Sequence, residues 1–367
     1  MRLPTADAPS RSAGRDKPVP YGHNPIGTLM HEADRLQLAV AECHRLSSSL
    51  AIVGHGSKAL LGPHKGEDTL STQSLSGIID YRPEELVVTA WAGTSLGELT
   101  EVLADKSQIL PFDPPRFGGA GTLGGALASG LSGPSRPWRG SVRDAVLGVE
   151  IVNGRGQRLR FGGSVMKNVA GYDVSRLMVG ARGTLGVILS ASVRVLPMPT
   201  TETTLAVACD AGEAGRLVRD WARRPLPITA TCYFANTLQL RVSGSAASVA
   251  SARSALGLRE PGDPYLWAAV RDHEHPFFAD SAGTITRLSL PRGSRFEAED
   301  ALVEWGGCQA WLRGRSIDPP RGAFATTYTP GRQPSTRPPA RAATAKVAAR
   351  LKDAFDPAGI FNPGAEG

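Results

Sequence analysis

Three glycines spaced three residues apart, Gly180, Gly183 and Gly186, constrain the fold of this chain most strongly. They follow an apolar-periodic segment and come directly before a β-branched run that begins at Val187. Glycine is favoured where the backbone needs a positive φ or where another group must approach closely. A surface loop rarely needs three such positions so close together, whereas a long phosphate-bearing cofactor does. The spacing therefore predicts a loop that runs along a nucleotide-containing ligand.

Two more glycine-rich loops precede this one. Residues 54–59, Gly-His-Gly-Ser-Lys-Ala, follow a short apolar run and match the G-x-G-x-x-A pattern of a dinucleotide-binding βαβ unit. Gly62 and Pro63 come too soon after them for a full helix to grow, and a Rossmann unit needs that helix to hold the pyrophosphate.

Residues 119–124 match G-x-G-x-x-G, but three prolines at 111–115 precede them where a central strand should lie. The pair of loops instead predicts concave anion sites built from successive backbone N–H groups, without a Rossmann helix. The alternative is that individual glycines are only turn residues.

Two long segments carry a family resemblance. Residues 167–188 resemble the FAD-binding domain of the vanillyl-alcohol oxidase and p-cresol methylhydroxylase (PCMH) family. Residues 133–144, Gly-Pro-Ser-Arg-Pro-Trp-Arg-Gly-Ser-Val-Arg-Asp, are similar to the FAD-binding E subunits of bacterial glycolate oxidases. The similarity extends over about 45–365, and it includes Glu304-Trp305-Gly306-Gly307 and the terminal run from Asp356 to Gly364.

The resemblance implies an α+β fold with two lobes. We expect a flexible arm at 1–27, a PCMH-type FAD-binding domain at 28–199 and a smaller α+β cap domain at 200–367, whose C-terminal helix and tail return toward the flavin. Pro197 and Pro199 mark the boundary, and the alternation of strands and helices changes after them. We also expect helices at 29–46 and 342–355, a hairpin around Asn153-Gly154, and a loop over 314–340.

The resemblance also implies where FAD, the expected cofactor, would be bound. Four segments of the family's site have matching residues in this chain. The first loop is matched by Gly54, His55, Gly56, Ser57 and Lys58, and the second loop by Gly118, Gly119, Thr122, Leu123, Gly124 and Gly125. A G-x-x-x-D turn near the phosphates and ribityl chain is matched by Ser141 and Asp144, and the segment toward the adenine by Gly183, Leu185, Gly186 and Ile188. Asn362 in the tail is a further candidate contact. Arg182 stands where many relatives have an acid, and the register of His55 does not match the pattern for covalent flavin attachment.

The residues needed for substrate chemistry are harder to find. Oxidation of a 2-hydroxy acid needs a base for the hydroxyl and a cation or metal for the carboxylate. The catalytic D-type relatives carry H-x-G-D-G-N-x-H, which this chain lacks, and its His273-Glu274-His275 cluster is followed by Pro276 and predicts a solvated polar turn. We therefore assign no catalytic residue and no metal.

The resemblance implies two partner subunits, a catalytic D-type subunit and an iron–sulfur F-type subunit, which oxidise glycolate with this chain. Two alternatives remain. In a self-sufficient dehydrogenase, Arg136, Arg139, Arg143 or Lys167 would hold the substrate carboxylate, and Tyr172 or His55 would act as base. In the other, a structural subunit has lost its flavin.

Composition excludes several other functions. The net charge of +7 is scattered and aromatic residues make up 6 %, so we expect no nucleic-acid binding. None of the four cysteines lies at C-x-x-C spacing, which argues against zinc, disulfides and an iron–sulfur cluster held by this chain. With no apolar run of membrane-spanning length and no signal peptide, we expect a cytoplasmic protein, and peripheral attachment to the inner face of the cell membrane stays open.

Overall fold

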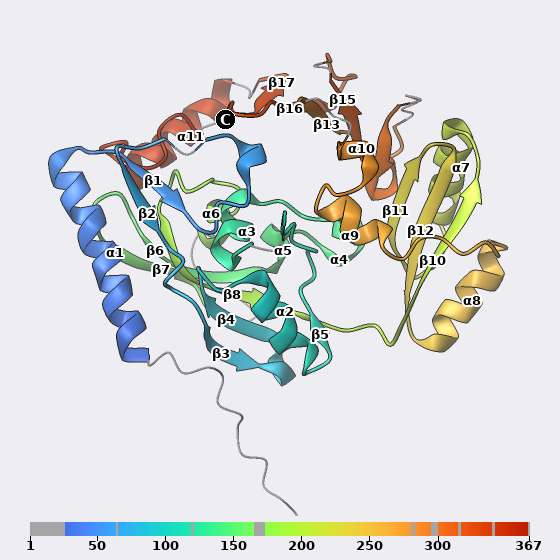
Figure 1. Ribbon diagram of the computed structural model, residues 1–367, viewed down its shortest axis with the longest axis horizontal. Coiled ribbons are helices and arrows are strands. Elements are labelled where there is room, and N and C mark those ends of the chain that lie inside the picture. The colour runs from blue at the N-terminus through green and yellow to red at the C-terminus, as the bar shows by residue number, and fades with distance from the viewer. Residues whose placement is uncertain are drawn as a thin grey trace, which may run out of the picture.

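Two separate β-sheets organise the chain into two lobes, each with its own helices (Figure 1). The computed structural model describes residues 26–63, 65–118, 121–164, 173–279, 283–294, 300–314, 317–339 and 342–365. Helices and strands alternate irregularly along both lobes, so the predicted α+β class is confirmed. Most of the predicted arm and the segment containing Lys167 and Tyr172 lie outside the described residues.

The first lobe is built on a five-stranded antiparallel sheet. Its strands, in spatial order, are β3 (Ile78–Arg82), β4 (Val87–Trp91), β8 (Val187–Arg194), β6 (Val146–Val152) and β7 (Arg158–Gly162). The predicted hairpin is β6–β7, and the Asn153 side chain accepts hydrogen bonds from the backbone N–H groups of Arg155 and Gln157 in its turn. The central strand β8 is buried along seven of its eight residues, which explains its unbroken apolar and small-residue sequence.

Short helices cover one face of this sheet and complete its core. They are α2 (Leu96–Ala104), α3 (Leu123–Ser129), α5 (Val142–Ala145) and α6 (Ser175–Met178). Helix α4 (Arg136–Arg139) instead lies against the second lobe. The sequence did not predict α3, because two glycines weaken helix propensity. Thr122 caps it by accepting from the Gly125 N–H, and Gly124 packs so closely on Ala92 that a Cβ there would lie 2.8 Å from the alanine Cβ.

A third layer joins the two ends of the chain. Helix α1 (Ile26–Leu46) buries the predicted stripe that includes Leu29, Ala33, Leu36 and Val40. Beside it, β1 (Leu50–Val53) and β2 (Asp68–Ser71) form a parallel pair, and Phe361 of the tail bridges to Leu50. The predicted C-terminal helix is α11 (Ala342–Phe355), which Figure 1 shows above β1.

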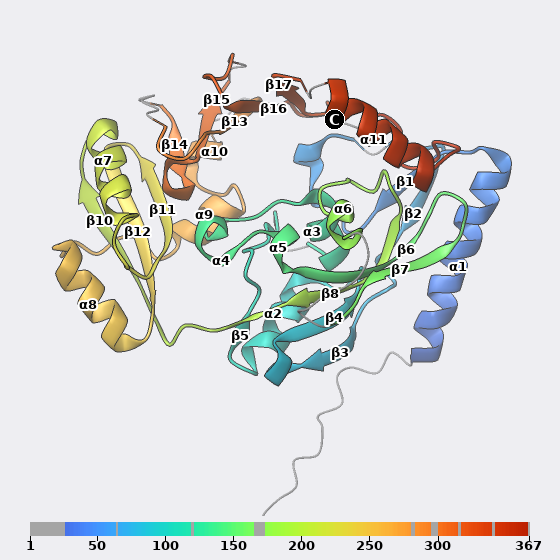
Figure 2. The same cartoon turned by 180° about the vertical axis from the view of Figure 1, so that it is seen from behind.

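The second lobe is an eight-stranded sheet with helices on both faces. Its spatial order is β10 (Thr201–Ala208), β12 (Thr237–Gly244), β11 (Ile228–Phe234), β14 (Leu302–Glu304), β15 (Gln309–Arg313), β13 (Ile285–Ser289), β16 (Phe324–Tyr328) and β17 (Ser335–Arg337). Helices α7 (Ala211–Trp221) and α8 (Ala246–Leu256) cover the outer side, while α9 (Leu266–Arg271) and α10 (Pro276–Ala279) face the first lobe (Figures 1 and 2). The loop expected over 314–340 was wrong, because β16 and β17 extend this sheet.

Specific polar contacts hold the two lobes together. The indole N–H of Trp305 donates to the Gly133 carbonyl at 3.1 Å, and the backbone N–H of Arg116 donates to Asp272 at 2.6 Å. Arg241 lies 3.3 Å from the Asp113 carboxylate. Burial alone would raise the pKa of Asp113, but the Arg241 charge and the Ser135 N–H hold it below its usual range.

The remaining short elements are the strands β5 (Gln108–Ile109) and β9 (Leu196–Pro197) and the 3-10 turns η1 (Ala59–Leu61), η2 (Pro83–Glu85) and η3 (Trp305–Gly307). Of the helices that the structure describes, none combines the length and the apolar character required to cross a bilayer.

Candidate functional site

A pocket in the first lobe gathers residues from four distant segments of the chain. It lies where the loop after β1, helix α3, the loop before β8 and the C-terminal tail meet, and it encloses about 840 Å³ of empty space, part of it open to solvent. Twelve of the predicted residues line it: Gly54, His55, Gly56, Ser57, Lys58, Thr122, Gly124, Gly125, Gly183, Gly186, Ile188 and Asn362.

The first loop presents backbone donors to this pocket. After β1 the chain makes only the three-residue turn η1, so the expected absence of a full helix is confirmed. Within the described chain, no acceptor pairs with the backbone N–H groups of Gly56, Ser57 or Lys58. Gly54 must be glycine, since a Cβ there would lie 2.8 Å from the Thr122 hydroxyl. Successive unpaired N–H groups of this kind are suited to phosphate oxygens.

Lys58 adds a positive charge to the same end. Among the described residues, its ammonium has one hydrogen-bond contact, a weak one with the Ser57 hydroxyl at 3.5 Å. Burial lowers the pKa of Lys58 to about 8, although the charge of Asp272 opposes this shift. The described lining residues include no aspartate or glutamate. The pocket is therefore suited to an anionic group that would keep the ammonium charged.

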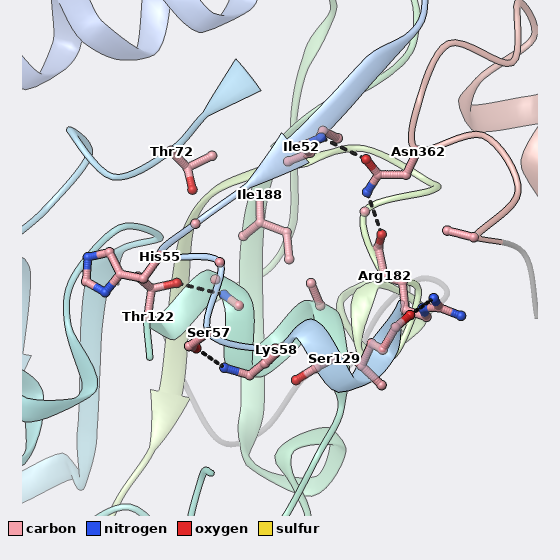
Figure 3. A pocket seen from close by; sticks show the side chains of 18 of the residues that line it. Ile52, His55, Ser57, Lys58, Thr72, Thr122, Ser129, Arg182, Ile188 and Asn362 are labelled. Atoms are coloured by element: carbon pink, nitrogen blue, oxygen red, sulfur yellow. Dashed lines mark hydrogen bonds between the residues drawn. The ribbon is translucent and has the colours of Figure 1, made fainter. Parts of the chain in front are cut away.

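The C-terminal tail closes the other end of the pocket. Figure 3 shows His55 and Thr122 at one end, and Asn362 and Arg182 at the other. The Asn362 side chain accepts from the Ile52 N–H and donates to the Arg182 carbonyl, both at 2.7 Å. Gly183 has φ +77°, and a Cβ there would lie 2.6 Å from the Asn362 amide nitrogen. Gly180 also has a positive φ and Gly186 lies against the Val152 carbonyl, so the backbone prediction for the three spaced glycines is confirmed.

A partly buried ion pair fixes that tail in place. The Lys352 ammonium lies 2.7 Å from the Asp356 carboxylate and also donates to the Thr184 carbonyl. Asp356 in turn accepts from the backbone N–H groups of Ile360 and Phe361. The tail is thereby oriented so that Asn362 faces the pocket.

Six of the predicted residues do not line the pocket, or cannot be placed. The Leu123 side chain is fully buried in the core of the lobe, and Leu185 packs against that core. Gly118 lies outside the lining, and Gly119 lies outside the described residues. Ser141 and Asp144 form a capping box at α5, in which Ser141 donates through its N–H and hydroxyl at 2.9 and 2.7 Å. These hydrogen bonds lower the pKa of Asp144. A cofactor role for Ser141, Asp144 and Gly118 stays a prediction.

Lining residues that the sequence did not single out include Leu61, Thr72, Ala128 and Ser129. None belongs to a motif, and only the folding of distant segments brings them together. Arg182 was noted only as a departure from the family. Its guanidinium donates to the Leu61 carbonyl and to the Gln333 side chain, which ties the first loop to the second lobe.

The candidates for a self-sufficient enzyme lie elsewhere. Arg136 stacks on the Trp305 ring, with its guanidinium carbon 4.6 Å from the centroid. Arg139 donates to Ser243 at 3.0 Å, and Arg143 is exposed. The solvated turn predicted around His273 was wrong for that residue. Its imidazole stacks on Phe278 with centroids 4.0 Å apart, and burial lowers its pKa to about 4.

Comparison with known proteins places these observations in a family context. Residues 28–162 match the family described as FAD binding domain. The chain is 40 % identical to glycolate oxidase subunit GlcE of Escherichia coli over 92 % of its own length and 98 % of that protein. It is 34 % identical to glycolate oxidase subunit GlcD of Bacillus subtilis, but only over 39 % of its length and 30 % of that protein.

A solved structure supports the fold. The structure of alkyldihydroxyacetonephosphate synthase superposes with a TM-score of 0.64 over 90 % of this chain and 74 % of that one. At 16 % identity this similarity concerns the fold alone.

Proposed function

The chain belongs to the family of glycolate oxidase subunit GlcE, and from this membership we propose that it is the FAD-binding subunit of a complex that oxidises glycolate, a 2-hydroxy acid, to glyoxylate. The observation that carries the proposal is the similarity to GlcE along nearly the whole of both chains, in a protein that contains an FAD binding domain. The pocket in the first lobe supports it, because its unpaired N–H groups and Lys58 favour an anionic ligand.

The residues of that pocket fit FAD in a definite orientation. Gly56, Ser57 and Lys58 would hold the pyrophosphate through backbone N–H groups and the ammonium. The end formed by Gly183 and Asn362 would receive the adenine side of FAD. Gly186 and Ile188 would line the pocket between this end and the pyrophosphate. FAD, when bound, supplies the hydride and electron transfer that no side chain of this protein can perform. The domains we propose are the FAD-binding domain at 28–199 and the cap domain at 200–367, whose tail packs on the first.

The partners we propose are a catalytic D-type and an iron–sulfur F-type subunit. Relatives are named as two different subunits of glycolate oxidase, which supports a heteromeric assembly. Cys43, Cys209 and Cys232 lie in three different hydrophobic clusters, so they cannot hold a cluster that passes electrons singly. We place the complex in the cytoplasm.

Reconstitution tests this proposal. The chain is to be purified alone, with each partner, and with both, and glycolate oxidation measured with an artificial electron acceptor. We expect activity only when the catalytic partner is present, and FAD bound to this chain in every preparation. Full glycolate oxidation by the chain alone would support the self-sufficient dehydrogenase instead. A colourless chain that still assembles would support the structural subunit that has lost its flavin.

A further inference from the structure

A second cavity lies between the two lobes and does not belong to the pocket described above. It encloses about 370 Å³ of empty space. The first lobe contributes apolar side chains, among them Phe117 and Leu131, and the second lobe contributes the polar groups of His273, Arg287, Glu304 and Gln309. Because both lobes form its walls, the cavity exists only when they are docked. Its size suits a ligand of a few heavy atoms.

Arg287 is a half-buried cation that lines this cavity. It lies on β13, and its buried Nε has no hydrogen-bond partner. Among the described residues, no carboxylate lies within ion-pair distance of its guanidinium, whereas Arg271 in the same wall is paired with Asp272 at 2.5 Å. Its guanidinium carbon lies 5.8 Å from the centroid of the Tyr328 ring, which leaves the buried Nε–H without an acceptor. A buried N–H group without an acceptor is costly, and the planar guanidinium group matches the shape of a carboxylate.

Gln309 supplies a second unsatisfied group on the same face of the sheet. The Glu304 carboxylate accepts from the Gln309 amide at 2.6 Å and from the Trp311 indole at 2.8 Å. This fixes the orientation of the amide, so its oxygen points away from Glu304, and that oxygen is buried without a donor. Gln309 is 3 % exposed, and water therefore has little access to it.

Strand register places these two groups close together. Arg287 is directly opposite Trp311, and Gln309 lies two residues before Trp311 on β15. Arg287 and Gln309 are therefore diagonal neighbours, with Cα atoms about 7–8 Å apart. A two-carbon acid that carries a hydroxyl on its second carbon can span such a gap.

Packed aromatic rings around His273 form an uncharged part of the cavity wall. The His273 ring is stacked on Phe278 and meets Trp311 and Phe117 edge-on, at 4.8 and 5.2 Å between centroids. His273 and Phe117 both have positive φ, a strained conformation for residues other than glycine that tends to occur at functional sites. Burial raises the pKa of Glu304, while its hydrogen bonds with Trp311 and Gln309 oppose this shift.

We propose that this cavity binds a small 2-hydroxy carboxylate, whose carboxylate accepts from Arg287 and whose hydroxyl donates to the Gln309 amide oxygen. This goes beyond the proposed function, which leaves the substrate site to the partner subunit. It depends on that function only for the choice of glycolate as probe.

Calorimetry on the full chain, under anaerobic conditions, tests the proposal with glycolate and with acetate, which lacks the hydroxyl. We expect glycolate to bind at least about tenfold more tightly than acetate, the ratio that corresponds to one well-placed hydrogen bond. Arg287→Met should weaken both ligands by more than about tenfold, because it removes a charged donor. Gln309→Leu should abolish the preference for glycolate and leave acetate binding unchanged.

Control variants keep the test decisive. Arg253→Met, an exposed arginine on α8, should bind both acids like the wild type. If Arg287→Met does not fold, Arg287→Lys serves in its place. It keeps the charge without the planar guanidinium group, and it should weaken the binding of glycolate by about tenfold. Absence of glycolate binding at millimolar concentration, equal affinity for both acids, or unchanged binding by the Arg287 variants would overturn the proposal. FAD content and complex assembly are measured separately. A failure of the proposed function can therefore be distinguished from a failure of the proposal for this cavity.

Discussion

Binding of FAD should weaken as the pH rises through about 8, because the affinity depends on the charge of Lys58. In the free protein, burial lowers the pKa of this lysine from 10.5 to about 8. A pyrophosphate beside the ammonium would raise it again, so FAD binding takes up a proton above pH 8. The affinity should be constant below the free-state pKa and should fall by up to about tenfold per pH unit above it, until the pKa of the bound state is reached.

Substitution of the lysine isolates this effect. Lys58→Met removes one charge-assisted hydrogen bond, worth about 1.5–3 kcal/mol, and should weaken FAD about 10- to 150-fold at pH 7. Its affinity should also no longer change around pH 8. Lys65→Met, an exposed lysine in the same loop region, is the matched control. Titration of the apoprotein with FAD, followed by quenching of flavin fluorescence, measures both quantities. An Lys58→Met variant that binds within about twofold of wild type, with the same pH profile, would refute this reasoning.

Three further predictions concern the C-terminal tail, the cap of α5 and the cysteines. Asn362→Ala leaves the Ile52 N–H and the Arg182 carbonyl without partners, at a cost of about 1–3 kcal/mol for each group. FAD should therefore bind at least about tenfold more weakly. Unchanged affinity in the same titration would count against the tail as part of the site. Asp144→Asn should destabilise the chain by about 1 kcal/mol in urea unfolding at pH 7. Because hydrogen bonds lower the pKa of Asp144, its contribution is present above the unfolded-state pKa and is lost as the pH falls through the folded-state value, so variant and wild type should converge in acid; a difference that persists there would contradict the capping role. Under native conditions, alkylation followed by mass spectrometry should label Cys308 first, and prior labelling of a buried cysteine would contradict the described packing of Cys43, Cys209 and Cys232.

Much of the fold follows from local patterns that the sequence displays directly. The apolar stripe of α1 and the Asn153-Gly154 turn of the β6–β7 hairpin both lie where the pattern predicts them. Gly62-Pro63 alone indicated that the first loop does not begin a Rossmann unit, and η1 is a single short turn. In each case, the information lies within about ten residues of chain.

The parts that the sequence did not predict depend on contacts between distant segments. Strands β16 and β17 have a loop-like composition and become strands by pairing along the edge of the second sheet. His273 has polar neighbours in sequence, but Phe117 and Trp311, which are remote along the chain, enclose it. The cavity between the lobes could not be predicted for the same reason, since its walls come from both sheets.

We propose that this chain holds FAD and needs a partner to oxidise the substrate. The most direct test is the visible absorption spectrum of the chain purified alone, recorded before and after anaerobic addition of glycolate. We expect a yellow protein whose flavin bands shift slightly at most and do not bleach. Bleaching by glycolate would contradict the need for a partner, and a colourless protein that takes up no added FAD would contradict the assignment of the cofactor.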